Sequence, residues 1–197
     1  MAYKKGTEIA TIDVVLVTID VYDLSTKEYK EDIALNTADQ ISVDPSIETT
    51  DAITLIIKGK LVAQKRGQST LTGNSITLRD NVFNPELVLC LQGGKIKYDS
   101  VDTDKVIGYT PPVAGSSLDD LPIFRLNAYS AQYDASGLIV RYEKITYPNC
   151  TGQPIAMSSE DNVFRVSEYT IISAPSEGEA PYDITYVDAL PTVSAGA

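Results

Sequence analysis

The sequence contains 197 residues, and its 43% of hydrophobic and 22% of charged residues provide enough apolar material for a folded core. Asp and Glu outnumber Lys and Arg by 27 to 16, and the net charge of -11 argues against a protein that binds nucleic acid or anionic membranes through its charge. The chain contains no histidine, which excludes Ser-His-Asp catalysis and His-ligated metal sites, so we expect neither an enzyme nor a bound cofactor.

Most segments alternate apolar and polar residues with a period of two, which is typical of β-strands. The pattern predicts strands at 10–22, 53–65, 75–79, 122–132, 137–147, 163–172 and 182–187. In 53–65, the odd-numbered side chains from Ile53 to Ala63 are expected to share the buried face of one half-buried strand. Asp134–Gly137 is predicted to be a hairpin loop. The chain is therefore predicted to be mainly β.

Residues 85–92 have the pattern of a short helix instead. Asn84 is a favourable N-cap, a proline follows it at the first helical position, and Gly93 lets the chain leave the helix. Leu87 and Leu91 are four residues apart and share one face. Because two helical turns are not stable alone, we expect these leucines to form a helix core packed against a sheet.

Two stretches, 99–121 and 174–181, are rich in Asp, Glu, Gly, Pro or Ser and are predicted to be loops. Asp99, Asp102 and Asp104 in the first loop suggest a calcium site. The chain lacks the glycine that an EF-hand starting at the second of them needs at its sixth position. We therefore expect a solvated acidic loop.

The organisation of the chain is simple. No linker divides it, so we predict one domain over residues 1–197. The apolar stretch Val14–Ile19 is far shorter than the roughly 20 residues of a membrane helix. With no apolar leader at the start, we expect a cytoplasmic product in which Cys90 and Cys150 stay reduced.

Charge is unevenly distributed along the sequence. Residues 99–197 hold 14 acidic and 5 basic side chains, whereas residues 52–79 contain no acid. The cations of the acid-free segment are Lys58, Lys60, Lys65, Arg66 and Arg79. In an acidic protein this segment suggests contacts with carboxylates of another copy, and the alternative is a solvated face.

The order Asp-Asn-Val-Phe-Asn-Pro-Glu at 80–86, followed by a leucine-rich segment and Gly93-Gly94, resembles the signature region of phage major tail tube proteins. In that family a strand, this turn and a short helix follow one another. Further segments are similar and come in the same order, at 141–152, 163–164, 168–171 and 181–191. The resemblance covers about residues 45–191.

The resemblance implies a β-sandwich with one short flanking α-helix, which assembles into hexameric rings. Extended strands of the subunits would form an inner β-barrel, and the rings would stack into the tail tube. We take Lys58, Lys60, Lys65 and Arg66 as candidate inter-subunit or barrel contacts. Such a tube is built around a tape-measure protein, ends in tail-end proteins and conducts DNA without binding it specifically. The protein would assemble in the host cytoplasm and reside in the virion tail.

A binding module is the alternative from another class. A monomeric β-sandwich adhesin or carbohydrate-binding domain of a phage or cell-surface structure would have a similar composition. A tube protein would form rings or filaments, whereas a binding module would stay monomeric and bind a ligand.

Overall fold

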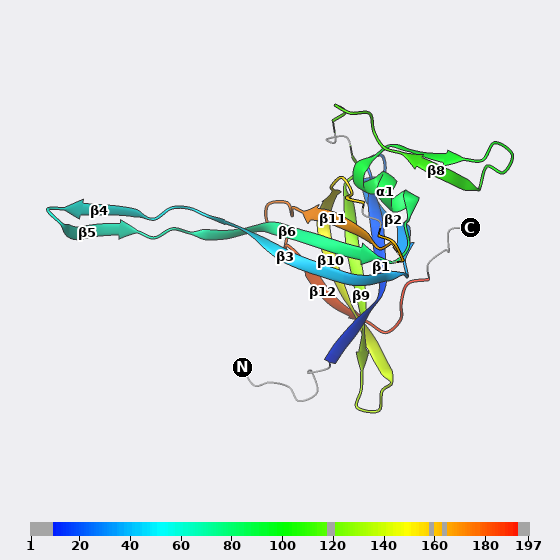
Figure 1. Ribbon diagram of the computed structural model, residues 1–197. Helices are drawn as coiled ribbons and strands as arrows, with labels where there is room; N and C mark the ends of the chain where they lie inside the picture. Colours follow the sequence, from blue (N-terminus) through cyan, green and yellow to red (C-terminus); the bar gives the residue numbers. More distant parts are fainter. Residues whose placement is uncertain (1–9, 118–120, 158–159, 163–164, 193–197) are drawn as a thin grey trace.

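The computed structural model describes residues 10–117, 121–157, 160–162 and 165–192. Within them the chain is mainly β, with one short helix (Figure 1). The strands are β1 (Ala10–Asp23), β2 (Glu28–Leu35), β3 (Ala38–Thr49), β4 (Ile53–Ile57), β5 (Lys60–Lys65), β6 (Ser69–Asp80), β7 (Lys95–Tyr98), β8 (Val106–Thr110), β9 (Phe124–Tyr133), β10 (Ile139–Gly152), β11 (Ser167–Ser173) and β12 (Asp183–Val187), and the helix is α1 (Pro85–Gln92). In these parts of the chain, no helix is long and apolar enough to cross a membrane.

An antiparallel sheet of eight strands forms the body of the molecule. Its strand order is β2-β1-β9-β10-β11-β6-β3, and β12 pairs with β10. The sheet coils until its β3 edge approaches β1, but the strands of the described residues do not close into a barrel. In place of the two packed sheets of the implied sandwich, one sheet folds over its own core.

Strand β10 serves two neighbours because its pairing changes along its length. Tyr142 to Thr146 pair with β12, whereas Cys150 to Gly152 pair with β11. Between these parts Asn149 has a φ of 46°, and the register against β9 shifts. A bulge of this kind bends a strand and increases its twist, so the sheet turns over the core here.

The core lies inside the coiled sheet and beneath α1. Its largest fully buried apolar side chains from the strands are Val17, Ile19, Ile76, Leu78, Phe124, Leu126, Tyr169 and Ile171. Leu87 and Leu91 of α1 are fully buried as well. The helix lies directly on β10, because a Cβ added to Gly152 would be 2.3 Å from Cα of Leu91. A glycine is therefore required at this contact.

Six of the seven predicted strands each overlap one observed strand, namely β1, β6, β9, β10, β11 and β12. The helix at 85–92 and the hairpin loop at 134–137 are also confirmed. The sequence prediction missed β2, β3, β7 and β8, because these strands mix charged residues, Pro or Gly with the apolar ones. Strand β8 lies within the segment predicted to be a long loop.

The prediction of a single strand over residues 53–65 is wrong. Residues 53–65 form two strands, β4 and β5, joined by a tight turn. For the predicted strand 163–172, residues 163–164 lie outside the described residues, and the observed strand begins at Ser167.

Candidate assembly surface

A long hairpin projects from the body. Strands β3 and β6 stay paired beyond the core, and β4 and β5 form the far end (Figure 1). We call residues 46–72 the arm. At its root, a Cβ added to Gly73 would lie 2.1 Å from the carbonyl oxygen of Ser173, and Nδ2 of Asn74 donates to the carbonyl of Pro181 at 2.9 Å. The body thus fixes the root of the arm, and the rest extends away from it.

The far end of the arm is closed by a tight turn at Lys58 and Gly59. Their φ values are 50° and 76°, and a type I′ hairpin turn requires positive φ at both central residues. The turn pairs Ile57 with Lys60, so odd-numbered residues of β4 face even-numbered residues at the start of β5. Leu61 therefore pairs with an even-numbered residue, and the predicted common face of all odd-numbered side chains is wrong.

The pairing distributes the side chains of the arm end over two faces, because paired residues share a face. One face carries Ile53, Leu55, Ile57, Lys60, Ala63 and Lys65. The other carries Thr54, Ile56, Leu61 and Gln64. Both faces of the hairpin thus contain large apolar side chains.

Every residue of β4 and β5 is exposed in the single chain, so the half-buried face predicted for 53–65 is wrong at this level. The large apolar side chains of the arm are 45–67% exposed, and they are Ile47, Ile53, Leu55, Ile56, Ile57, Leu61, Val62 and Leu71. A contiguous exposed apolar surface of this kind marks an interaction site. The arm contributes nothing to the core of its own chain.

The candidate cations of the sequence lie on this arm. We call Lys58, Lys60, Lys65 and Arg66 the arm cations. All of them are exposed. Lys58 lies in the turn and Lys60 directly follows it, and the other two lie where β5 ends. The ion pairs that the described residues form do not include an arm cation.

A second hairpin, residues 95–110, projects from the side of the body opposite to the arm (Figure 1). It consists of β7, β8 and the loop between them. Within the loop, Oδ1 of Asp99 accepts from the backbone N–H of Val101 at 2.9 Å, and the backbone N–H of Asp99 donates to the carbonyl of Lys105 at 2.9 Å. The acidic loop expected from the sequence therefore has a defined conformation at the end of a hairpin.

The C-terminal end of α1 holds the second hairpin. The Tyr109 hydroxyl donates to the carbonyl of Gly93 and accepts from Nε2 of Gln92 at 3.0 Å. Gly94 has a φ of 103°, and a Cβ there would lie 2.4 Å from the carbonyl oxygen of Thr110. The glycine pair after the helix thus lets β8 approach it closely.

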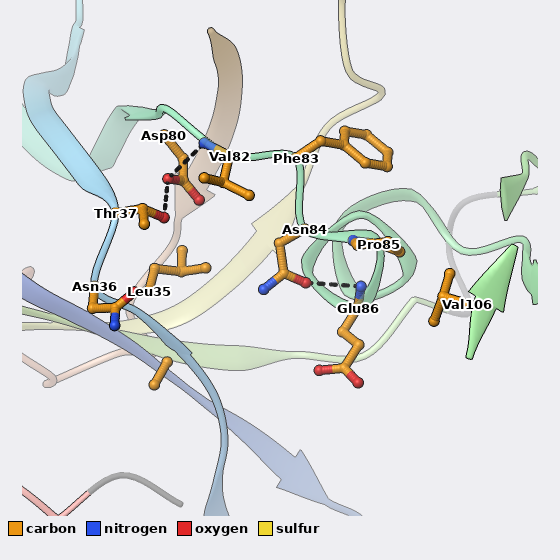
Figure 2. A pocket seen from close by; sticks show the side chains of 11 residues that line it. Leu35, Asn36, Thr37, Asp80, Val82, Phe83, Asn84, Pro85, Glu86 and Val106 are labelled. Atoms are coloured by element: carbon orange, nitrogen blue, oxygen red, sulfur yellow. Dashed lines mark hydrogen bonds between the residues drawn. The ribbon is translucent and has the colours of Figure 1, made fainter. Parts of the chain in front are cut away.

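The motif behind the family resemblance lies beside a pocket of about 310 Å³ (Figure 2). Oδ1 of the buried Asp80 accepts from Oγ1 of Thr37 at 2.5 Å and from the backbone N–H of Val82 at 3.2 Å. Oδ1 of Asn84 accepts from the first free N–H groups of α1 at 2.9 and 3.1 Å. The motif therefore ends β6, turns the chain and begins the helix.

Where the chain is described, no group of His, Cys, Asp and Glu is arranged to hold a metal ion. Cys90 and Cys150 are both buried. Burial raises the pKa of Cys150 to about 12, which keeps this thiol protonated at neutral pH. The motif serves the fold.

A network of hydrogen-bonded polar side chains, which the sequence patterns do not predict, lies on the face of β1, β9 and β10 that points away from the core. Oδ2 of Asp20 accepts from Nε and Nη2 of Arg125 at 2.9 and 2.7 Å and from Nδ2 of Asn127 at 3.0 Å. The same amide donates to Thr18 and accepts from Thr146. A lone aspartate and a lone asparagine inside apolar strand patterns were the available signals, since buried polar groups require partners.

No family model matches the chain, and no curated protein matches it. Some solved structures contain a chain that is similar to this one. A chain of the sheath-tube complex of an extracellular contractile injection system in its extended state is 16% identical, with 93% of this chain and 95% of that chain covered and a TM-score of 0.45. A chain of the tube-terminating cap of the anti-feeding prophage is 11% identical, with 95% and 97% covered and a TM-score of 0.41.

A chain of the baseplate of the same prophage is 10% identical, with 94% and 97% covered and a TM-score of 0.37. Identities and TM-scores at this level do not define a function.

Proposed function

We propose that this chain is a structural subunit of a tail tube, which self-assembles into stacked hexameric rings. The observation that carries the proposal is the arm, which exposes apolar side chains on both faces and, among the described residues, supplies none to the core. The turn-and-helix motif at 80–94, which resembles that of tail tube proteins, supports the family.

The physical reason for assembly is the hydrophobic effect. Each Leu or Ile side chain that moves from water into a contact contributes about 1.5–3 kcal/mol when it is fully buried. The arm offers several such side chains and extends away from the body, so a neighbouring copy is the natural surface to cover them.

Pairing between sheets supports the inner barrel. The eight-stranded sheet ends in β2 and β3, whose outer edges carry backbone groups that can pair with another strand. A ring in which subunits pair through such edges has a continuous sheet without open edges. In the proposed particle, a virion tail or a related tail, the subunits surround a tape-measure protein and meet tail-end proteins at each end.

The negative charge suits a conduit for DNA. A net charge of -11 disfavours phosphate binding, so DNA would slide through the tube without being held. Specific recognition of DNA is not required of such a subunit.

Negative-stain microscopy and sedimentation velocity of the full-length chain test the proposal. We expect rings or tubes with multiples of six subunits. Replacing the facing pair Ile56→Ser and Leu61→Ser at the arm end should reduce assembly without changing the free energy of unfolding, because both side chains are exposed. Leu24→Ser, at an 83% exposed position on the body, is the matched control. A chain that stays monomeric at high concentration and binds a ligand would instead be the binding module.

A further inference from the structure

We propose that the end of the arm of one copy docks on the second hairpin of another copy. This inference rests on the proposed function and names the surface that receives the arm. The arm end comprises β4, β5 and the turn between them, and the receiving surface is residues 95–110.

The positions of the two hairpins mean that a contact between the arm and the second hairpin joins two different copies of the chain. They leave the body on opposite sides, so the arm of a chain points away from its own second hairpin (Figure 1). A contact between two different surfaces is heterologous, and every copy then offers one donor and one acceptor. Repetition of such a contact gives a closed ring or an open filament, as a tube subunit requires.

Both surfaces are apolar and exposed. On the second hairpin the exposed apolar side chains are Tyr98, Val101, Val106 and Ile107, with exposed fractions of 41–92%. The arm end presents Leu55 and Ile57 on one face and the pair of Ile56 and Leu61 on the other. Contact between the hairpins would remove both sets from water.

The charges of the two ends are opposite. Lys58 lies in the turn of the arm and Lys60 directly follows it, and Asp102 and Asp104 are exposed in the loop of the second hairpin. Lys105 is the single cation of the loop between β7 and β8, so the loop itself is net negative, whereas β7 beside it carries Lys95 and Lys97. Opposite charges give a docking contact its orientation and register and increase the rate of encounter.

A mixing experiment tests this contact. The arm variant carries Lys58→Glu and Lys60→Glu, and the hairpin variant carries Asp102→Lys and Asp104→Lys. Each variant alone should assemble about tenfold more weakly than the unmodified chain at low salt, a loss of about 1.4 kcal/mol per contact. When the two variants are mixed, arms with Glu meet hairpins with Lys and the original arms meet the original hairpins. The mixture should therefore recover assembly to within about twofold of the unmodified chain.

A control mixture has the same net charge as the first mixture but lacks the complementary contact between arm and hairpin. The arm variant is mixed with a chain that carries Glu160→Lys and Asp161→Lys, two exposed residues outside both hairpins. The second chain keeps both original surfaces and should assemble by itself, but its hairpins carry Asp and should not receive the Glu-bearing arms, so the assemblies should include little of the arm variant. Sedimentation velocity that follows a fluorescent label on the arm variant measures its recovery in all the mixtures.

The outcomes separate the two proposals. Recovery in both mixtures, or in neither, would overturn the docking contact while the unmodified chain still forms tubes. An unmodified chain that never assembles would overturn the proposed function itself.

Discussion

The hydroxyl of Tyr109 donates a hydrogen bond to the carbonyl of Gly93, and so ties the last strand of the second hairpin to the end of α1. The same hydroxyl accepts from Nε2 of Gln92, whose Oε1 accepts from the backbone N–H of Ile155 at 3.0 Å. One phenol therefore connects the hairpin, the helix and the chain that follows β10.

Tyr109→Phe should lower the free energy of unfolding by about 1–3 kcal/mol, because the amide of Gln92 and the carbonyl of Gly93 each lose a partner in a partly buried place. Urea denaturation of the subunit measures this change. Tyr98→Phe in the same hairpin is the control, since this ring is 49% exposed. Equal effects of the two substitutions would show that the hydrogen bonds of Tyr109 contribute nothing.

Leu87→Ala should lower the free energy of unfolding by about 2–5 kcal/mol, because the side chain is fully buried and its removal leaves a cavity. Leu89→Ala in the same helix should change it much less, since Leu89 is 36% exposed. Urea denaturation below the concentration of assembly compares them. If Leu87→Ala spares the subunit and impairs only assembly, the helix docks on a neighbour instead.

Gly152→Ala should force α1 away from β10, because the new Cβ would lie 2.3 Å from both Cα and the carbonyl oxygen of Leu91. Overpacking of this kind typically costs about 1–3 kcal/mol. Gly108→Ala is the matched control, since the nearest atom there is the flexible Cδ of Lys97 at 3.8 Å. Thermal unfolding that is unchanged by Gly152→Ala would contradict the close packing.

The subunit should lose stability in alkaline solution. Burial raises the pKa of Cys150 from 9.0 to about 12 and that of Tyr147 from 10.0 to about 12. As the pH rises from about 9 to 12, the unfolded chain releases these protons first. The free energy of unfolding then falls by up to about 1.4 kcal/mol per pH unit for each group.

Urea denaturation at a series of pH values measures the slope, which Cys150→Ala should make shallower above pH 9. An unchanged slope in this variant would mean that the thiol titrates normally in the folded chain.

The arm cations at the end of β5 should serve assembly more than folding. Lys65→Glu together with Arg66→Glu should weaken tube formation and leave the unfolding transition unchanged, because both side chains are exposed. Each exposed ion pair contributes only about 0–1 kcal/mol, but every copy in a ring repeats it. Raised salt should weaken the assembly of the unmodified chain by screening the same pairs. Normal assembly of the double variant at low salt would place these cations outside the interfaces.

The sequence by itself determined the parts of this protein whose signals are local. Alternation with a period of two located most of the strands that form the core, but not β2 or β3. Asn84, a proline and a glycine pair marked the helix, because capping depends on adjacent residues. The absence of histidine excludes chemistry that requires an imidazole.

Only the tertiary structure decided where the apolar side chains of 53–65 lie. Alternation in the sequence indicates that one face of a strand is apolar, but not whether the same chain covers that face. The turn at Lys58-Gly59 also changes which residues of β4 and β5 share a face. Asp20 and Arg125 are hydrogen-bonded to each other although they lie 105 positions apart in the sequence, a separation that local sequence patterns do not report. The two hairpins project from opposite sides of the body because the path of the coiled sheet fixes where each one leaves it.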